Sequence, residues 1–353
     1  MTKTIKTILT VGTMLMVNQF SFAGATEDLW IALKAANDVD ALKAIAAGAD
    51  LSNIDATQSQ PLSLAACFSG AEVITALINA KANINYVQPT NGNSPLMNAA
   101  TWGNTDAVKL LLAAGANTKF KSKIGQTLLS LGVGSVKLEI VKMLVESGCD
   151  PKETFNIPPS EESWTVMISL IASYPPKDKA ENIKKIGENI DKAGLTYPSR
   201  LINVKESDFT PLGDIAKYLL EQGADPNVKS GGWGCILNQA IAFNHPDIAL
   251  VLVNAKANLT EKTSVQGEVS GFSAPSLMLA SIKGMNAVVE AMCKAGADIN
   301  YTAEEQKSEG SNNGSYVTIT TTRKYNTALS LAVDEGHNDT AEILKKYGAT
   351  MPE

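Results

Sequence analysis

Short apolar runs at helical spacing recur in pairs along most of this chain. A run rich in leucine and alanine comes first, as in residues 62–66 (LSLAA), and a leucine-rich run comes second, as in residues 108–112 (VKLLL). Apolar residues at i, i+3 and i+4 form the buried stripe of a helix. A glycine such as Gly70 or Gly103 separates the two runs. The pattern therefore predicts pairs of short helices.

The helix pairs recur with a period of about 33 residues. In each unit, the residue before the first leucine lies 20 positions ahead of a closing glycine or lysine. These pairs of positions are Asp28 and Gly48, Pro61 and Lys81, Pro95 and Gly115, Leu128 and Gly148, Ile236 and Lys256, Ser276 and Gly296, and Ala328 and Gly348. A repeat of this size buries its apolar face only against its neighbours, so we expect a stack with a long open surface.

Each unit closes with a recognisable turn. The tripeptide is Gly-Ala followed by Asp or Asn at residues 48–50, 115–117, 223–225 and 296–298. Glycine suits the left-handed position that ends a helix, and Asp or Asn supports a turn through a bond from its side chain to the backbone. We therefore expect each second helix to end at this tripeptide.

These residues resemble the ankyrin repeat, whose pattern is roughly T-P-L-H-x-A-A-x-x-G-H-x-x-V-V-x-L-L-L-x-x-G-A-D. About seven units match well and two match in part, over most of residues 27–350. The resemblance implies an all-α solenoid of about nine helix-turn-helix units with β-hairpin loops and a concave protein-binding face. The histidine of T-P-L-H is replaced throughout, by Ser63, Met97, Ser130, Asn238, Met278 and Ser330, and the Gly-His pair survives only as Gly336-His337.

The repeats divide the chain into segments. Residues 1–23 are a predicted signal peptide, 24–150 hold repeats one to four, 151–228 hold degenerate repeats with an insertion, and 229–353 hold the remaining repeats. Within 151–210, Pro158-Pro159 and Pro175-Pro176 break helices, so we expect two degenerate repeats and an insertion of about ten residues there. A hinge or domain boundary is the alternative for this segment.

A second insertion is predicted at residues 301–325. A turn cluster at residues 310–314 precedes strand-forming residues 315–322, which is typical of an extended hairpin. A protruding hairpin and an irregular surface insertion both fit this sequence.

The N-terminal residues have the features of an export signal. Lys3 and Lys6 precede a mostly apolar run at residues 8–20, and Ser21-Phe22-Ala23 places small residues at a cleavage site. We expect cleavage near Ala23 and a periplasmic or secreted protein of bacterial type. The alternative is an uncleaved N-terminal anchor, although the apolar run is short for a membrane span.

Composition narrows the partners that this chain is expected to bind. The formal net charge is −6 and no dense stripe of lysine and arginine occurs, so we expect a protein partner and no nucleic acid. We expect no membrane insertion after signal cleavage, and a monomer.

The four cysteines, Cys67, Cys149, Cys235 and Cys293, are interpreted as small buried apolar residues. Cys235 with Cys293 is the one disulfide that we consider.

Catalytic chemistry is not expected. Of the two histidines, His337 matches the structural histidine of the repeat and His245, before Pro246, is expected at the surface. We find no metal-ligand spacing, nucleophile motif or phosphate loop, and we expect no cofactor and no enzyme activity. The rival to a scaffold is a hydrolase whose carboxylates converge from distant repeats.

The candidate binding residues are aromatic. Two positions past the alanine pair, aligned units hold Phe68, Trp102, Ser135, Phe243, Lys283 and Glu335. The resemblance places this position at the end of the inner helix on the concave face, with Phe68 and Trp102 roughly 10 Å apart. Predicted loop tips add Tyr86, Phe120 and Trp233. Exposed aromatic residues are enriched at binding hot spots, although these rings would instead stabilise the stack if they pack on the next repeat.

The sequence thus favours a non-catalytic scaffold, exported to the periplasm or medium, that binds a partner protein through its concave face and loop tips. The alternatives are a secreted effector that binds host proteins, and a stabiliser or inhibitor of one exported enzyme.

Overall fold

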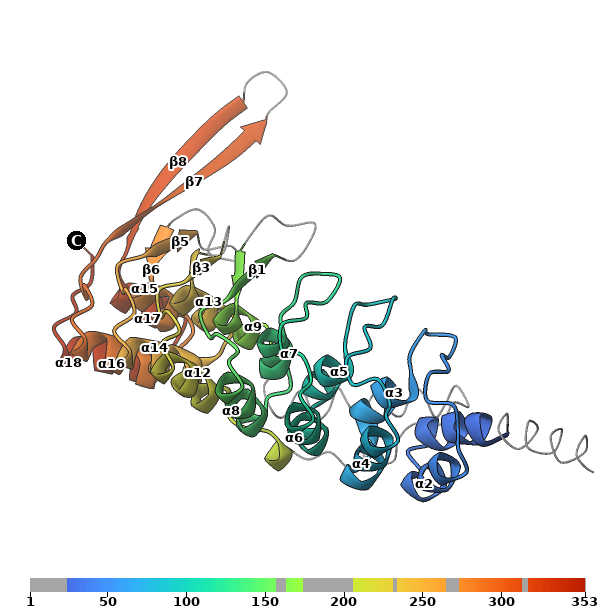
Figure 1. Cartoon of the computed structure of the whole chain (residues 1–353). Helices are drawn as coiled ribbons and strands as arrows, with labels where there is room; N and C mark the ends of the chain where they lie inside the picture. The colour runs from blue at the N-terminus through green and yellow to red at the C-terminus, as the bar shows by residue number, and fades with distance from the viewer. Residues whose placement is uncertain are drawn as a thin grey trace, which may run out of the picture. The chain divides into compact units, whose positions relative to one another are not determined.

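Paired short helices make up most of the computed structural model, which describes residues 24–156, 163–173, 206–230, 234–264, 273–312 and 317–352. The predicted helical repeats are therefore confirmed (Figure 1). The chain divides into two compact units. Unit 1 is Met1–Glu161 with Ser173–Thr210, and unit 2 is Glu162–Ala172 with Pro211–Glu353. The predicted signal peptide lies outside the described residues.

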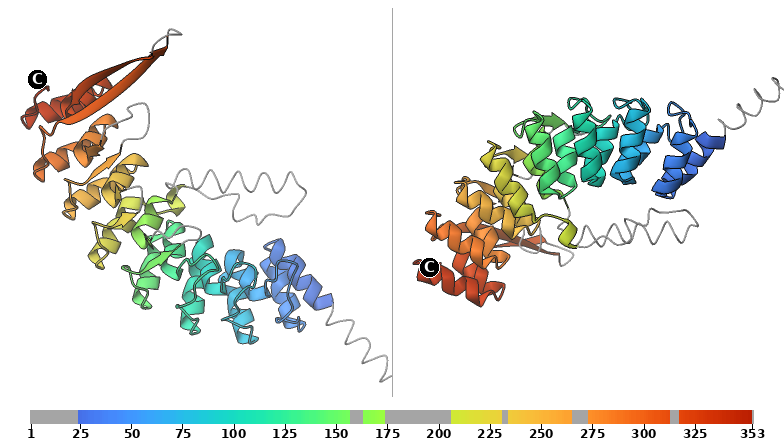
Figure 2. Two further views of the ribbon diagram at one scale, coloured as in Figure 1. Left: turned by 90° about the horizontal axis from the view of Figure 1, so that it is seen from above. Right: turned by 60° about the horizontal axis from the view of Figure 1, so that its bottom comes forward.

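Unit 1 contains two rows of helices. Its elements are a helix at residues 24–34, α2 (Asp38–Ala46), α3 (Pro61–Phe68), α4 (Ala71–Asn79), α5 (Pro95–Trp102), α6 (Thr105–Ala113), α7 (Leu128–Gly134), α8 (Leu138–Glu146), β1 (Thr154–Asn156) and the 3-10 helix η1 (Glu206–Asp208). The first or inner helices α3, α5 and α7 pack side by side, as do the second or outer helices α2, α4, α6 and α8 (Figure 2). Ala99 and Ala100 are fully buried on α5, which allows this close packing.

Unit 2 repeats the arrangement. Its elements are β2 (Ser163–Thr165), α9 (Val166–Ile171), α12 (Leu212–Glu221), β3 (Lys229–Ser230), β4 (Gly234–Cys235), α13 (Ile236–Ala242), α14 (Pro246–Asn254), β5 (Lys262–Ser264), β6 (Ser273–Pro275), α15 (Ser276–Ile282), α16 (Asn286–Lys294), β7 (Ala303–Asn312), β8 (Val317–Asn326), α17 (Ala328–Asp334) and α18 (Asn338–Lys346). The inner row is α9, α13, α15 and α17, and the outer row is α12, α14, α16 and α18. The described residues of the two units contain eight helix pairs, and the predicted total of about nine stays a prediction.

Helices α9 and α12 form one repeat, although residues 172–211 separate them in sequence. The two helices pack on each other, α9 packs on α13, and α12 packs on α14. They are therefore the inner and outer helices of a single repeat. The segment between them is longer than the expected insertion of about ten residues, and most of it, residues 174–205, lies outside the described residues.

Local residues explain where the helices begin and end. The Thr127 and Thr327 side chains accept bonds from the backbone N–H groups of Ser130 and Ser330, forming capping boxes at α7 and α17. The closing glycines adopt positive φ, for example 83° at Gly115. The turn asparagines and aspartates then accept the predicted backbone bonds, for example from the backbone N–H of Ser52 to Asp50 and of Lys119 to Asn117.

Two-stranded antiparallel sheets connect consecutive repeats of unit 2. β3 pairs with β4, and β5 pairs with β6 so that Lys262 lies opposite Pro275. β7 pairs with β8 from Ala303 opposite Asn326 to Asn312 opposite Val317. These longest strands connect α16 to α17 and project from the helices of unit 2 (Figure 1).

The four cysteines are free thiols in the structure. Cys149, Cys235 and Cys293 are buried, as predicted, whereas Cys67 is half-buried. Burial raises the pKa of all four thiols, to about 12 for Cys67 and about 11 for Cys293. Among the described residues, no helix is both long and apolar enough to cross a membrane.

Candidate protein-binding surface

Two aromatic rings meet where neighbouring inner helices end. Phe68 is the last residue of α3 and Trp102 is the last residue of α5. Gly103 ends α5 in the left-handed conformation, with φ 72°, and Ser69 ends α3 in an extended one. Both rings therefore lie at the ends of their helices.

The two rings form a direct edge-on contact. Their centroids are 4.8 Å apart and their planes are inclined by 66°. The expected separation of roughly 10 Å was wrong, because helix stacking sets the distance between axes while these side chains lean toward each other. Trp102 is 43% exposed and Phe68 is half-buried. An aromatic pair of this geometry contributes about 0.5–1.5 kcal/mol beyond the area it buries, so the rings have a structural role as well as an exposed edge.

The other aligned positions differ in exposure. Ser135, after α7, is buried and its hydroxyl donates to the carbonyl of Gly132 at 2.6 Å. Phe243, after α13 in unit 2, is 50% exposed. Lys283 and Glu335 are also exposed. The aromatic surface of unit 1 at this position is thus confined to the Phe68–Trp102 pair.

The predicted loop-tip residues are only partly available. The Tyr86 hydroxyl donates to the carbonyl of Gln58 at 2.8 Å, which ties its loop to the preceding one. Phe120 is half-buried. Trp233 lies outside the described residues. Tyr86 therefore has a structural bond that the sequence did not reveal.

Side chains at the start of the outer helices fix the ends of the inner helices. Asn104 donates from Nδ2 to the carbonyl of Ser69 at 2.9 Å, and Lys137 donates from Nζ to the carbonyl of Gly103 at 2.8 Å. Both bonds reach the residue directly after an aromatic ring. The backbone that carries Phe68 and Trp102 is therefore held by the following repeat.

Histidines make the same bond in unit 2. His337 Nε2 lies 2.9 Å from the carbonyl oxygen of Ile282, and His245 Nε2 lies 2.9 Å from that of Ile171. His245 is 5% exposed, so its predicted surface position was wrong. The sequence signal was its place immediately before an outer helix, where His337 also stands.

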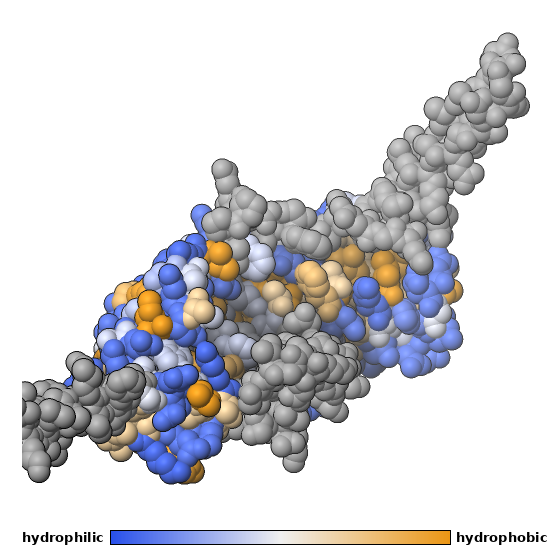
Figure 3. All heavy atoms as spheres, turned by 90° about the vertical axis from the view of Figure 1, so that its right-hand side faces the viewer, coloured by the Kyte–Doolittle hydropathy of each residue, from blue (hydrophilic) through white to orange (hydrophobic). Residues whose placement is uncertain are grey.

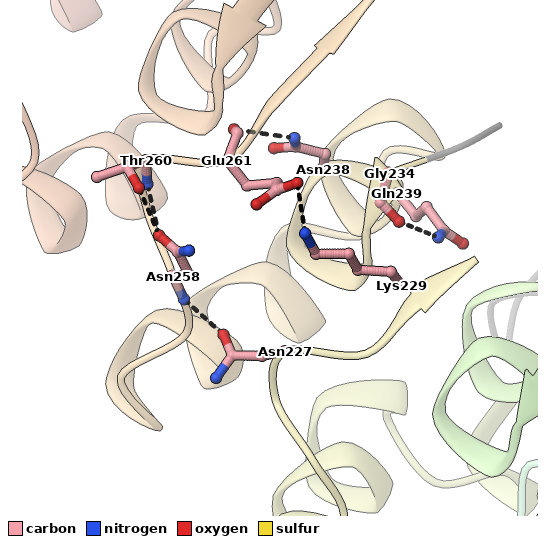
Figure 4. A network of polar contacts seen from close by, with 8 residues as sticks. All are labelled: Asn227, Lys229, Gly234, Asn238, Gln239, Asn258, Thr260 and Glu261. Atoms are coloured by element: carbon pink, nitrogen blue, oxygen red, sulfur yellow. Dashed lines mark hydrogen bonds and ion pairs between the residues drawn. The ribbon is translucent and has the colours of Figure 1, made fainter. Parts of the chain in front are cut away.

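An asparagine replaces the missing histidine of one inner helix (Figure 4). Asn238 donates from Nδ2 to the carbonyl of Glu261 at 3.3 Å. Its Oδ1 also accepts from the Ser276 hydroxyl at 2.6 Å. The Glu261 carboxylate also pairs with Lys229 at 2.8 Å. Adjacent loops of unit 2 are thus joined by polar contacts.

A cysteine, Cys67, lies next to Phe68 in the sequence. With its pKa raised to about 12, the neighbouring Cys67 thiol stays protonated near neutral pH and is a poor nucleophile. Within the described ranges, no group of three or more His, Cys, Asp and Glu side chains could hold a metal ion.

Comparison with known proteins agrees with this geometry. The family model "Ankyrin repeats (3 copies)" matches residues 29–122 and 62–155. An ankyrin repeat protein of Acanthamoeba polyphaga mimivirus is 33% identical over 130 residues, which cover 34% of this chain and 80% of the relative.

Two longer relatives match smaller shares. Mask-1, an ankyrin repeat and KH domain-containing protein of Caenorhabditis elegans, is 36% identical over 94 residues, or 26% of this chain and 4% of mask-1. An ankyrin repeat-containing protein of Treponema pallidum (strain Nichols) is 34% identical over 97 residues, or 28% of this chain and 33% of the relative. Ankyrin repeats are typically non-catalytic protein-interaction modules. On its repeats, its paired helices and these similarities, the chain belongs to the ankyrin repeat family.

Proposed function

We propose that this chain is a non-catalytic scaffold that binds a partner protein at the ends of its inner helices, around Phe68 and Trp102. The observation that supports the proposal is the aromatic pair itself, in which Trp102 is 43% exposed. Asn104 holds the backbone next to Phe68, and Lys137 holds the backbone next to Trp102. A rigid exposed ring contributes binding energy at little entropic cost, which is why tryptophan is enriched at hot spots.

The test compares partner capture with stability. Trp102→Ala removes the more exposed ring, and Val39→Ala removes an apolar side chain that is 64% exposed on α2, in a different repeat from either ring. We expect Trp102→Ala to weaken capture by roughly thirtyfold, or about 2 kcal/mol. We expect it to lower the free energy of unfolding by about 1–3 kcal/mol, from the ring pair together with the buried part of the Trp102 side chain. Val39→Ala should leave both quantities unchanged.

The opposite pattern would contradict the proposal. If Trp102→Ala retains the partner, or if its unfolding free energy falls by about 3–5 kcal/mol as for a core aromatic residue, the ring is structural only. Adding Phe68→Ala completes a double-mutant cycle that separates the ring-to-ring energy from the binding energy.

We further propose that the chain is exported and meets its partner outside the cytoplasm. The support is Lys3 and Lys6, the apolar run at residues 8–20 and the small residues that end at Ala23. Mass spectrometry of the protein from its native cells should find an N-terminus between Gly24 and Thr26. An intact Met1 on the cytoplasmic protein would refute export without affecting the binding proposal.

A further inference from the structure

In the part of the chain that the structure describes, the first repeat exposes the face on which a preceding repeat would stack. Ile31 occupies the inner-helix position that Asn98 and Leu131 occupy in later repeats. Asn98 donates from Nδ2 to the carbonyl of Ser63 in the preceding repeat at 3.2 Å, and both Asn98 and Leu131 are buried. Ile31 is instead 61% exposed. A position that is buried at Asn98 and Leu131 therefore carries an exposed apolar side chain at this end.

Two hollows meet at Ile31. One has a volume of about 710 Å³ and lies between the helix at residues 24–34 and the following loop, with Trp30 and Ile54 in its wall. The other has a volume of about 330 Å³, and its wall includes Ala32, Ala35, Ala44 and Ala47 from residues 24–47. Small side chains in a groove let a helix approach closely. Figure 3, which faces the side of Figure 1 where α2 lies, shows apolar patches among polar ones at this end.

The polar groups of the first loop are already used within the repeat. In the second repeat, Gln88 reaches back to the carbonyl of Thr57 at 2.9 Å. The matching residue of the first repeat, Asp55, accepts from the backbone N–H groups of Thr57 and Ser59 in its own turn. Asn53 likewise accepts from Trp30 Nε1 at 2.9 Å. An occupant of this face would therefore meet Ile31 and Ile54 rather than extend the loop-to-loop bonds.

The charge around the two hollows is acidic. Among the described residues, their walls contain five carboxylates, Glu27, Asp28, Asp40, Asp50 and Asp55, against the two amines of Lys34 and Lys43. Lys43 pairs with Asp40 at 2.7 Å, and Lys34 Nζ lies 5.6 Å from the centre of the Trp30 ring. A second copy of this face would bring like charges together, whereas a basic rim would complement it.

From these observations we infer that the N-terminal end of the stack docks an amphipathic helix of a partner protein, with aliphatic side chains on one face and lysine or arginine beside them. The aliphatic side chains pack on Ile31 and Ile54, continuing the helix-on-helix packing of the repeats. The basic side chains approach Glu27 and Asp28 on the rim. This surface is separate from the Phe68–Trp102 pair and does not depend on it.

A designed peptide serves as the probe for the full chain. It is a fluorescein-labelled helix with leucines at i, i+3, i+4 and i+7 and lysines on the flanks, and a second peptide carries glutamates in place of the lysines. We expect saturable binding of the lysine peptide by fluorescence anisotropy, and binding of the glutamate peptide weaker by about tenfold or more. Raising the salt concentration should weaken binding of the lysine peptide.

The matched variants separate the apolar contact from the charge. Ile31→Glu combined with Ile54→Glu makes the end more acidic, which by charge alone would favour the lysine peptide. We nevertheless expect at least a tenfold loss of affinity, because the apolar contact is removed. Val39→Glu adds the same kind of charge on α2, outside the walls of both hollows, and should leave the affinity within about twofold. All three positions are more than half exposed, so melting curves should remain close to that of the unaltered chain.

Four results would overturn the inference. They are the absence of saturable binding up to about 1 mM peptide, equal affinity for the two peptides, full binding by the double variant, and loss of binding by Val39→Glu. Light scattering supplies a fifth test. A dimer that the double variant dissociates would identify a second copy as the occupant, whereas the monomer expected from the sequence is consistent with the inference.

Discussion

Two lysines occupy positions that favour glycine, and replacing them should stabilise the protein. Lys81 and Lys256 close their repeats with φ of 66° and 62°, in the left-handed region. Glycine fills the equivalent place elsewhere, as at Gly115 with φ 83°. The backbone bonds are the same, since the N–H of Lys81 donates to Ile78 at 3.0 Å and that of Gly115 donates to Leu112 at 3.0 Å. Exchange to glycine therefore changes backbone strain without removing a backbone bond.

The magnitude follows from two opposing terms. A side chain in the left-handed region costs about 1–2 kcal/mol relative to glycine. Glycine loses about 0.5–1 kcal/mol more conformational entropy when the chain folds. Both lysine side chains are exposed, so little packing is lost. We expect Lys81→Gly and Lys256→Gly each to raise the free energy of unfolding by about 0.5–1 kcal/mol.

Urea denaturation, followed by circular dichroism, measures this change. Lys109→Gly is the matched control, because Lys109 is exposed within α6 and its exchange should cost about 1 kcal/mol. Gly115→Ala is the reciprocal test. A Cβ at Gly115 would meet no atom within 4 Å, so the loss of about 1 kcal/mol expected there reports backbone strain alone. If Lys81→Gly destabilises the protein as Lys109→Gly does, the strain argument is refuted.

Three further predictions concern His245, Gly125 and Cys67. His245→Ala should lower the unfolding free energy by about 1–3 kcal/mol in urea, because the carbonyl of Ile171 loses its partner. Gly125→Ala should cost more than Gly115→Ala in the same assay, because its Cβ would lie 2.4 Å from the carbonyl oxygen of Asn156. Cys67 has a pKa of about 12, so only about one thiol in 10,000 is ionised at pH 8, and its alkylation should be slow in the native state, accelerate tenfold per pH unit, and become fast on denaturation.

Local patterns were sufficient to predict the repeat and its helix ends. A closing glycine and the Asp or Asn of the turn after it act within a few residues of each other, as at Gly48 and Asp50. The local sequence therefore contains the information that sets the ends of the helices. One irregularity of the repeat pattern, the closing lysine at positions 81 and 256, coincides with positive φ outside glycine.

Contacts between distant segments were beyond such patterns. Whether α9 pairs with a helix nearby or with α12 depends on which apolar faces fit after folding. The edge-on contact of Phe68 with Trp102 depends on the directions of two side chains 34 positions apart, which the helix spacing does not determine. The same limit affected His245, whose partner Ile171 lies 74 residues earlier.

The repeat-to-repeat bond at the start of the outer helix shows how this chain varies its surface from repeat to repeat without changing its fold. Asn104, Lys137, His245 and His337 differ in size and charge, yet each bonds a carbonyl at the end of the preceding inner helix. The acceptor is a backbone carbonyl oxygen in all four cases. The bond therefore fixes the backbone at the end of the inner helix and does not require a particular side chain beside it. Residues next to those carbonyls, such as Trp102, can therefore vary between repeats at little cost to the stack. This freedom is what allows a binding surface to be built on the ends of the inner helices.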